Sequence, residues 1–132
     1  MRATLALLLA MVLVLSSIGS PAYAAKSSMT GDYAKDTVSV AHILQDTIAI
    51  ADDDESRSDA EQEAVVIITD YIARYRNRPK VNQTVSFTTM QTALNAMAGH
   101  IKSFTNRPIP EELKSRLNKE LTKAEKLVLS ES

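Results

Sequence analysis

The segment 89–117, TMQTALNAMAGHIKSFTNRPIPEELKSRL, decides the expected fold. Its first part repeats apolar residues every three or four positions, which is the spacing of one face of an α-helix. The turn Asn106-Arg107-Pro108 ends that pattern, because the residue before a proline avoids the helical region. A second apolar stripe starts at Leu113, and Pro110 is suited to the first position of a new helix. The segment therefore predicts two helices joined by a short turn.

The same spacing recurs along the rest of the chain. It predicts four helices, over about residues 31–50, 58–77, 85–104 and 110–129. The β-branched run 65–68 is flanked on both sides by helical spacing, and the chain has no Asn-Gly or Asp-Gly hairpin signal. Four stripes joined by short loops predict an all-α protein, an up-down-up-down four-helix bundle.

Several local signals refine this expectation. Thr30 or Asp32 is the expected N-cap of the first helix. Ser58 and Glu61 have the spacing of a capping box, which predicts the start of the second helix. Gly99 costs about 1 kcal/mol in a helix relative to alanine. Its presence fits either a close approach of two helix backbones or a position near the helix end.

Residues 1–24 are predicted to be a secretory signal peptide. A basic Arg2 precedes an apolar run, and Ala22-Tyr23-Ala24 fits a signal peptidase site. The apolar run is shorter than the roughly 20 residues of a membrane-spanning helix. An uncleaved N-terminal anchor is the alternative. We expect an exported helical domain over residues 25–132.

Charge is nearly balanced in total but unevenly placed. The net charge is −1, which gives no global field for nucleic acid. Residues 25–70 hold 3 basic and 11 acidic residues, whereas residues 71–132 hold 11 basic and 5 acidic residues. This asymmetry could orient a partner. Alternatively, the opposite charges meet across helix interfaces.

The chain contains no cysteine. The domain must therefore be held together by its core without disulfides. Thiol catalysis, cysteine-based metal sites and a lipid anchor on an N-terminal cysteine are likewise excluded from the expectation.

No catalytic motif or cofactor motif is apparent, so no enzymatic activity and no cofactor are predicted. The acidic run 52–55 could bind manganese or calcium, and an exported metal-binding bundle is the rival function. As a calcium loop, however, this run would place Arg57 where the sharp turn requires glycine. A solvated acidic loop is the other interpretation. His42 and His100 are isolated and lack the spacing of a metal motif.

Two groups of residues are candidate contacts for a protein partner. The first lies near the end of the second helix, where arginines accompany tyrosines, the residue types enriched at interface anchors: Tyr71, Arg74, Tyr75 and Arg78. A purely structural role is the alternative there, since cations complement a helix C-terminus. The second is an uncharged strip beside the third apolar stripe, containing Gln91 and Asn95. These amides could instead bond to neighbouring helices.

The segment 89–117 also carries a resemblance to a known family. The runs Thr89–Asn95, Ala98–His100 and Asn106–Pro108, with Pro110, closely resemble the Psb27 family of lumenal photosystem II assembly and repair factors. Further matching positions are Thr30-Gly31, Tyr33, Asp36-Thr37, Tyr75-Arg76, Leu113-Lys114 and Arg116-Leu117. The resemblance spans nearly all of residues 25–132.

The resemblance implies a non-enzymatic four-helix bundle in the thylakoid lumen. It implies transient binding to photosystem II, mainly to a lumenal loop of the inner-antenna chlorophyll protein, before the manganese cluster is built. Such factors are expected to hold off the extrinsic subunits until that step. Cyanobacterial members commonly carry a lipid-modified cysteine, which this chain lacks. A signal at the very N-terminus fits a cyanobacterial or plastid-encoded gene.

The family role adds the turn Asn106, Arg107 and Pro108 to the candidate contacts. Arg107 could instead cap the end of the third helix. We expect a monomer that contacts neither nucleic acid nor, through an acyl chain, the membrane.

Overall fold

The computed structural model describes residues 29–131, so the predicted signal peptide lies outside the described part of the chain. Four long helices and one short helix make up the regular structure. They are α2 (Tyr33–Ala49), α3 (Arg57–Tyr75), α4 (Pro79–Asn82), α5 (Val85–Ser103) and α6 (Glu111–Glu131). Residues 29–131 contain no strand, which confirms the all-α class.

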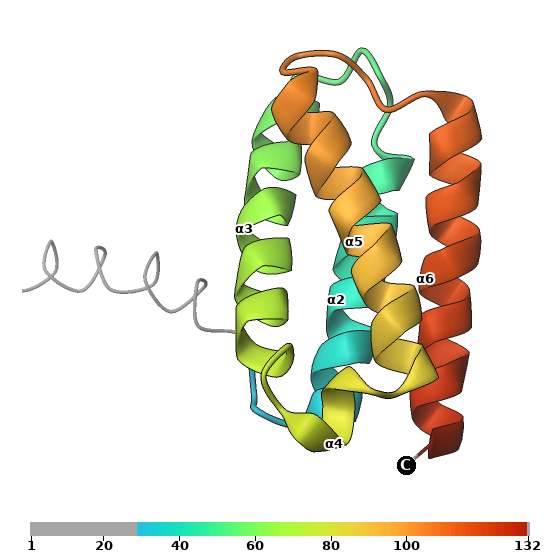
Figure 1. Cartoon of the computed structure of the whole chain (residues 1–132). Coiled ribbons are helices and arrows are strands. Elements are labelled where there is room, and N and C mark those ends of the chain that lie inside the picture. Colours follow the sequence, from blue (N-terminus) through green and yellow to red (C-terminus); the bar gives the residue numbers. More distant parts are fainter. Residues whose placement is uncertain (1–28, 132) are drawn as a thin grey trace, which may run out of the picture.

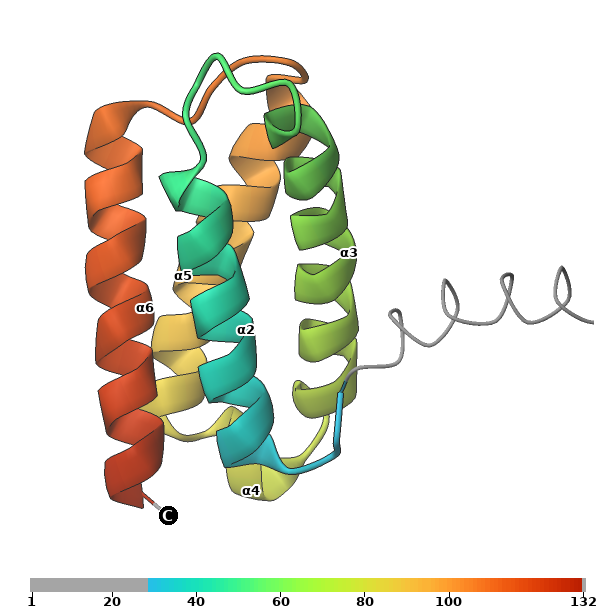
Figure 2. The same cartoon turned by 180° about the vertical axis from the view of Figure 1, so that it is seen from behind.

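The four long helices stand side by side, and successive helices run in opposite directions (Figure 1). Around the ring, α2 packs against α3, α3 against α5, α5 against α6, and α6 against α2. The view from behind shows α3 and α6 on opposite flanks of α2 (Figure 2). The connections α2–α3 and α5–α6 meet at one end of the molecule. The short helix α4 and the C-terminal end of α6 lie at the other (Figure 1).

The core is built from the predicted stripes. Its largest fully buried apolar side chains come from all four long helices: Leu44, Ile68, Met90, Leu94, Met97, Leu117 and Leu121. Burying one such side chain contributes about 1.5–3 kcal/mol. Ile109, only 2% exposed, anchors the α5–α6 connection to this core. Within residues 29–131 no helix is long and apolar enough to cross a membrane.

The helix starts agree with two expectations and correct two others. Asp32 caps α2 by accepting a hydrogen bond from the backbone N–H of Lys35 (3.1 Å). Thr84 caps α5 in the same way, accepting from the N–H of Phe87 (3.2 Å). Helix α6 begins at Glu111, so Pro110 precedes the first turn and its carbonyl accepts from the N–H of Lys114 (2.9 Å).

The predicted capping box at Ser58 and Glu61 is wrong. Helix α3 begins at Arg57, and Ser58 already lies inside its first turn. The carboxylate of Glu61 accepts from the guanidinium of Arg57 (3.2 Å) instead of reaching back to a backbone N–H. A hydrogen bond from a charged guanidinium stabilises a buried carboxylate more than one from a backbone amide does. Glu61 therefore pairs with Arg57 and does not form the predicted capping box.

Two further differences concern Gly99 and the segment after Pro79. Gly99 is exposed, and a Cβ added to it would meet no atom within 4 Å, so it marks no close approach of helices. The polar segment expected to be a loop includes one helical turn, α4, with Pro79 as its first residue. Val81 of that turn is 8% exposed and closes the lower end of the core.

Candidate functional site

The acidic run 52–55 is tied into the surrounding structure. Asp52 accepts a hydrogen bond from Lys114 Nζ (2.7 Å), and this contact raises the pKa of the lysine. Asp54 accepts from the backbone N–H and the hydroxyl of Ser56 (both 2.8 Å), which lower the pKa of its carboxyl. Among residues 29–131 no group of three or more His, Cys, Asp or Glu could hold a metal ion. The geometry offers no support for the rival metal-binding function.

A buried polar cluster links the start of α2 to the end of α3. Asp36, 2% exposed, accepts hydrogen bonds from the N–H groups of Thr30 (2.8 Å) and Gly31 (3.1 Å). The hydroxyls of Thr30 and Tyr75 also donate to its carboxylate. Burial alone would raise the pKa of Asp36, but these hydrogen bonds outweigh it and the pKa is lowered.

Tyr71 and Tyr75 belong to the core and not to a partner surface. Both rings are 0% exposed, which contradicts their role as contact candidates. Thr37 donates its hydroxyl proton to the carbonyl of Tyr33 (2.7 Å), so the Tyr71 hydroxyl donates to Thr37 Oγ1 (2.7 Å). Burial raises the pKa of both Tyr71 and Tyr75. Both tyrosines continue the apolar stripe of α3, with Ala64 and Ile68, so the spacing already indicated burial. The surface role was suggested by the neighbouring arginines and by the enrichment of tyrosine at interfaces.

Arg78 and Arg74 differ in their surroundings. The guanidinium of Arg78 lies 4.7 Å from the centre of the Tyr75 ring and donates to the carbonyl of Gly31 (3.3 Å). Arg78 therefore holds residues 29–32 against the end of α3 while staying exposed. Arg74 is exposed in the last turn of α3.

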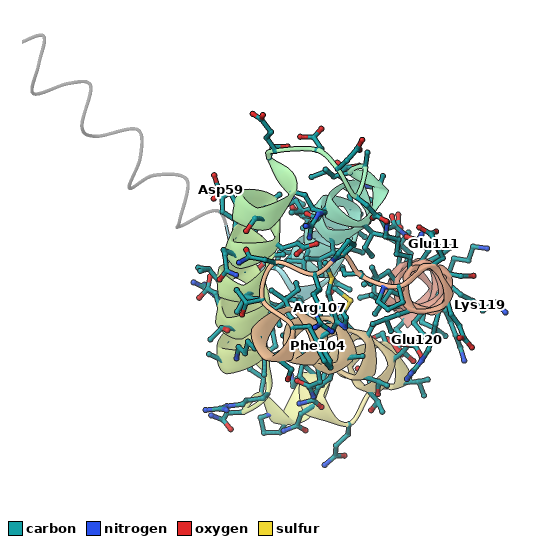
Figure 3. All side chains as sticks on the ribbon, turned by 90° about the horizontal axis from the view of Figure 1, so that it is seen from above. Asp59, Phe104, Arg107, Glu111, Lys119 and Glu120 are labelled. Atoms are coloured by element: carbon teal, nitrogen blue, oxygen red, sulfur yellow. The ribbon has the colours of Figure 1, made fainter. Side chains whose placement is uncertain are left out.

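The α5–α6 connection forms an exposed tip, which we define as residues 104–108. Phe104 is 47% exposed, and the guanidinium of Arg107 lies 6.0 Å from the centre of its ring. Figure 3, from above, shows the two side chains next to each other over the end of α5. The backbone N–H of Arg107, not its side chain, bonds to the carbonyl of Phe104 (3.0 Å). Arg107 thus does not cap the helix with its guanidinium.

Asn106 fixes the conformation of the tip. Its φ is 68°, the left-handed region that asparagine tolerates better than most residues. Its side-chain oxygen accepts from the Ser58 hydroxyl and its carbonyl from Arg57, both at 3.4 Å. Together with the buried Ile109, these contacts join the tip to the start of α3. The side chains of Phe104, Arg107 and Pro108 remain at the surface.

The outer face of α5 leads from α4 to this tip. Lys102 is the one charged residue among the exposed residues of α5. The others are uncharged: Val85, Thr88, Thr92, Asn95, Gly99 and Ser103. Gln91 is half-buried at the edge of this face. Helix α5 contains no acidic residue at all. Interface centres are depleted in charged residues, so this face has the composition of a contact surface.

The predicted contact residues therefore do not form one patch. Arg74 and Arg78 lie at the α4 end of the molecule, and Asn106, Arg107 and Pro108 at the opposite end, with Gln91 and Asn95 on α5 between them (Figure 1). Sequence reasoning missed Phe104. Its position in the apolar stripe of the third helix resembles a core position, and only the end of α5 at Ser103 places it outside.

A comparison of the sequence with protein families decides the relationship. The family model described as "Photosystem II Pbs27" matches residues 1–128. The chain belongs to the Psb27 family.

Individual members of the Psb27 family are similar over most of the chain. The "Photosystem II lipoprotein Psb27" of Synechocystis sp. is 43% identical over 121 residues, which are 92% of this chain and 90% of that protein. The "Photosystem II assembly factor lipoprotein Psb27" of Thermosynechococcus vestitus is 38% identical over 120 residues, 91% of this chain and 87% of the relative. The chloroplastic "Photosystem II repair protein PSB27-H1" of Arabidopsis thaliana is 33% identical over 72% of this chain and 55% of its own length. The three relatives are thus named as a photosystem II lipoprotein, an assembly factor lipoprotein and a repair protein.

Solved Psb27 structures share the fold. A solution structure of Psb27 from cyanobacterial photosystem II has a TM-score of 0.75 and 42% identity, over 80% of this chain and 91% of that one. The crystal structure of PSB27 from Arabidopsis thaliana has a TM-score of 0.73 and 31% identity, over 76% of this chain and 99% of that one. The helices described above are thus those of the Psb27 family.

Proposed function

We propose that this protein is a non-enzymatic assembly and repair factor of photosystem II in the thylakoid lumen. It binds transiently to the lumenal side of the complex, mainly to a lumenal loop of the inner-antenna chlorophyll protein. It does so before the manganese cluster is built and holds off the extrinsic subunits. The scaffold is a monomeric up-down-up-down four-helix bundle, with α4 as an added turn.

The observation that carries the proposal is the continuous surface formed by the outer face of α5 and the tip. The tip pairs an exposed aromatic ring, Phe104, with a guanidinium that makes no hydrogen bond within the described residues, Arg107. Arginine and aromatic side chains supply most of the energetic anchors of interfaces. The tip is held by Asn106 and Ile109, so little further ordering is needed when a partner binds.

The surface also suits a partner that must leave. Only one full charge, Lys102, lies on the exposed face of α5, and most of its other side chains are small and polar. A modest interface of this kind, at or below about 1,200 Å², is typical of transient complexes. Two relatives are named lipoproteins, and an acyl chain raises the local concentration of such a protein at its membrane. None of the 132 residues here is a cysteine that could carry one.

A pull-down from detergent-solubilised thylakoids tests the proposal. The wild-type protein should capture photosystem II complexes that contain the inner-antenna protein but lack manganese and extrinsic subunits. Phe104→Ser and Arg107→Glu should each reduce capture roughly fivefold or more, because loss of an interface anchor typically costs more than about 1 kcal/mol. Circular dichroism should show unchanged helix content, since neither side chain is part of the core.

The matched control is Lys35→Glu. It makes the same change of charge at an exposed position of α2, at the end of the bundle opposite the tip. Equal losses in Arg107→Glu and Lys35→Glu would mean that overall charge, not the tip, governs the effect of Arg107, whereas Phe104→Ser tests the tip without any change of charge. Wild-type protein recovered without photosystem II at low salt would overturn the proposed function itself.

A further inference from the structure

The outer face of α6 carries a row of lysines that the proposed contact surface does not use. Lys119, Lys123 and Lys126 recur at intervals of four and three residues, so they project from the same side of the helix within about 10 Å along its axis. We call these three residues the lysine row. All three are exposed, and Figure 3 shows Lys119 on the side of α6 that faces away from the bundle.

The lysine row is not neutralised by its neighbours. Glu120 pairs with Arg116 (3.2 Å) on the side of α6 toward α5 (Figure 3). Glu125 pairs with His42 of α2 (2.9 Å) on the other side. No ion pair of the described residues includes Lys119, Lys123 or Lys126. Three full positive charges therefore face solvent together.

The other acidic residues of α6 lie toward its two ends: Glu131, in the last turn, accepts a hydrogen bond from the backbone N–H of Ser86 at the start of α5 (3.4 Å). Glu111 and Glu112 lie in the first turn of α6, and the acidic run 52–55 lies at the same end of the molecule (Figure 1). At physiological ionic strength charges are screened beyond about 8 Å, so a surface close to the lysine row experiences mainly the lysines. The chain as a whole has a net charge of −1, so attraction to an anionic surface must come from a local group such as this one.

We propose that the lysine row binds the anionic headgroups of a lipid bilayer and holds the protein flat on the membrane surface along α6. Lysine is a compact charge on a flexible stem, whereas arginine makes the bidentate contacts that fix a protein carboxylate in place. Arg116 continues the row at its N-terminal end but is paired with Glu120 (3.2 Å), so the unpaired charges are all lysines. Unpaired lysines suit a planar, mobile array of headgroups better than a defined protein site. The contact replaces a lipid anchor, for which no residue of this chain offers a thiol.

Apolar side chains beside the lysine row reinforce this geometry. Leu127 is half-buried on the α5 side of the lysines, and Leu129 is 57% exposed on the other side, near Ala34 and Val38 of α2. Side chains in these positions enter the headgroup region when basic residues bring a helix to the surface. The apolar face of α6 itself is buried in the bundle, so Leu127 and Leu129 supply only local apolar contact beside the lysines, and the lysine charges carry the binding.

Vesicle co-sedimentation tests the proposal without photosystem II, so its outcome is independent of the proposed function. The exported protein, purified from the periplasm of a bacterial host, is mixed at low salt with vesicles of neutral phosphatidylcholine alone or with one third anionic phosphatidylglycerol. We expect binding only to the anionic vesicles, and its loss at high salt. The triple variant Lys119→Gln/Lys123→Gln/Lys126→Gln should bind about 100-fold more weakly, from a contribution of about fivefold per lysine.

The control is the triple variant Arg76→Gln/Lys80→Gln/Lys102→Gln, which removes the same charge from exposed positions on other elements. It should bind within a few-fold of the wild type. Equal losses in the two triple variants, or equal binding to neutral vesicles, would overturn the proposal. The proposal would also be overturned if the wild-type protein failed to bind anionic vesicles while the lysine variant lost photosystem II capture. That combination would assign the lysine row to an acidic protein surface.

Discussion

The hydroxyl of Tyr75 donates a hydrogen bond to the carboxylate of Asp36, and both groups are buried between α2 and α3. The same carboxylate also receives the N–H groups of Thr30 and Gly31. A single acidic side chain thereby fixes the entry of the chain into the bundle and the last turn of α3. Several properties of the protein depend on this junction.

Tyr75→Phe should lower the free energy of unfolding by about 1–3 kcal/mol. The substitution keeps the ring but leaves a buried charged acceptor without one of its donors, and an unmade hydrogen bond of this kind costs that much. Urea denaturation followed by circular dichroism measures the difference. Tyr33→Phe is the control, because the Tyr33 hydroxyl bonds to the neutral hydroxyl of Ser86 (2.6 Å) in a less buried place. A larger loss in the control would show that Asp36 does not depend on Tyr75.

Acid should weaken the protein through Asp36. Its pKa is lowered in the folded state from 3.8, so this contribution to stability is complete well above pH 3.8 and is lost as the pH falls through the folded pKa. Asp36→Asn should be less stable at neutral pH but should lose less on acidification. Thermal unfolding between neutral pH and strong acid checks this. Parallel curves for the two proteins would exclude Asp36 as the source.

Alkali should unfold the protein through its buried tyrosines. The pKa values of Tyr71 and Tyr75 are raised from 10.0, mainly by burial. Their contribution is complete below pH 10 and is lost as the pH rises toward the folded values. Tyrosinate absorbance and circular dichroism, recorded together, should show that these two hydroxyls ionise only when helix content falls. Smooth ionisation of all tyrosines in the folded protein would contradict this.

One chemical change at two glycines should have opposite effects. Gly99→Ala should stabilise the protein by about 0.5–1 kcal/mol, since Gly99 lies exposed in α5 and the added methyl group meets nothing. Gly31→Ala should destabilise it by about 1–2 kcal/mol, because Gly31 has a φ of 88°. Thermal denaturation of both variants measures the contrast. A destabilising Gly99→Ala would mean that this face is not open in solution.

Much of the fold could be predicted because apolar periodicity reports the core directly. In the segment 89–117, the apolar residues spaced three or four apart include Leu94 and Leu117, and both are fully buried. Errors arose where side chains compete for the same partner. Glu61 has the spacing of a capping residue, but the sequence does not reveal that the Arg57 guanidinium donates a hydrogen bond to its carboxylate. Helix ends shifted by one or two residues for the same reason, since caps depend on contacts across the bundle.

The candidate surface was less predictable than the fold. Asn95 and Arg107 were expected at the surface and are exposed. Tyr75 was expected there too, but it is buried. Its hydroxyl donates a hydrogen bond to Asp36 of α2, which is 39 residues away in the sequence. Phe104 has the spacing of a core residue and lies one position beyond the last turn of α5. Burial at such edges depends on where neighbouring helices end, and a single sequence does not contain that information.

The start of α2 and the end of α6 lie at the same end of the molecule, opposite the tip (Figure 1). Helix α6 is 21 residues long, so its last residue stands about 30 Å from the level of the tip. A fluorescent protein or an affinity handle attached beyond Glu131 would therefore lie at the end of the bundle opposite the tip and leave Phe104 uncovered. The C-terminus is the attachment point for following this protein in living cells without masking the surface proposed for its partner.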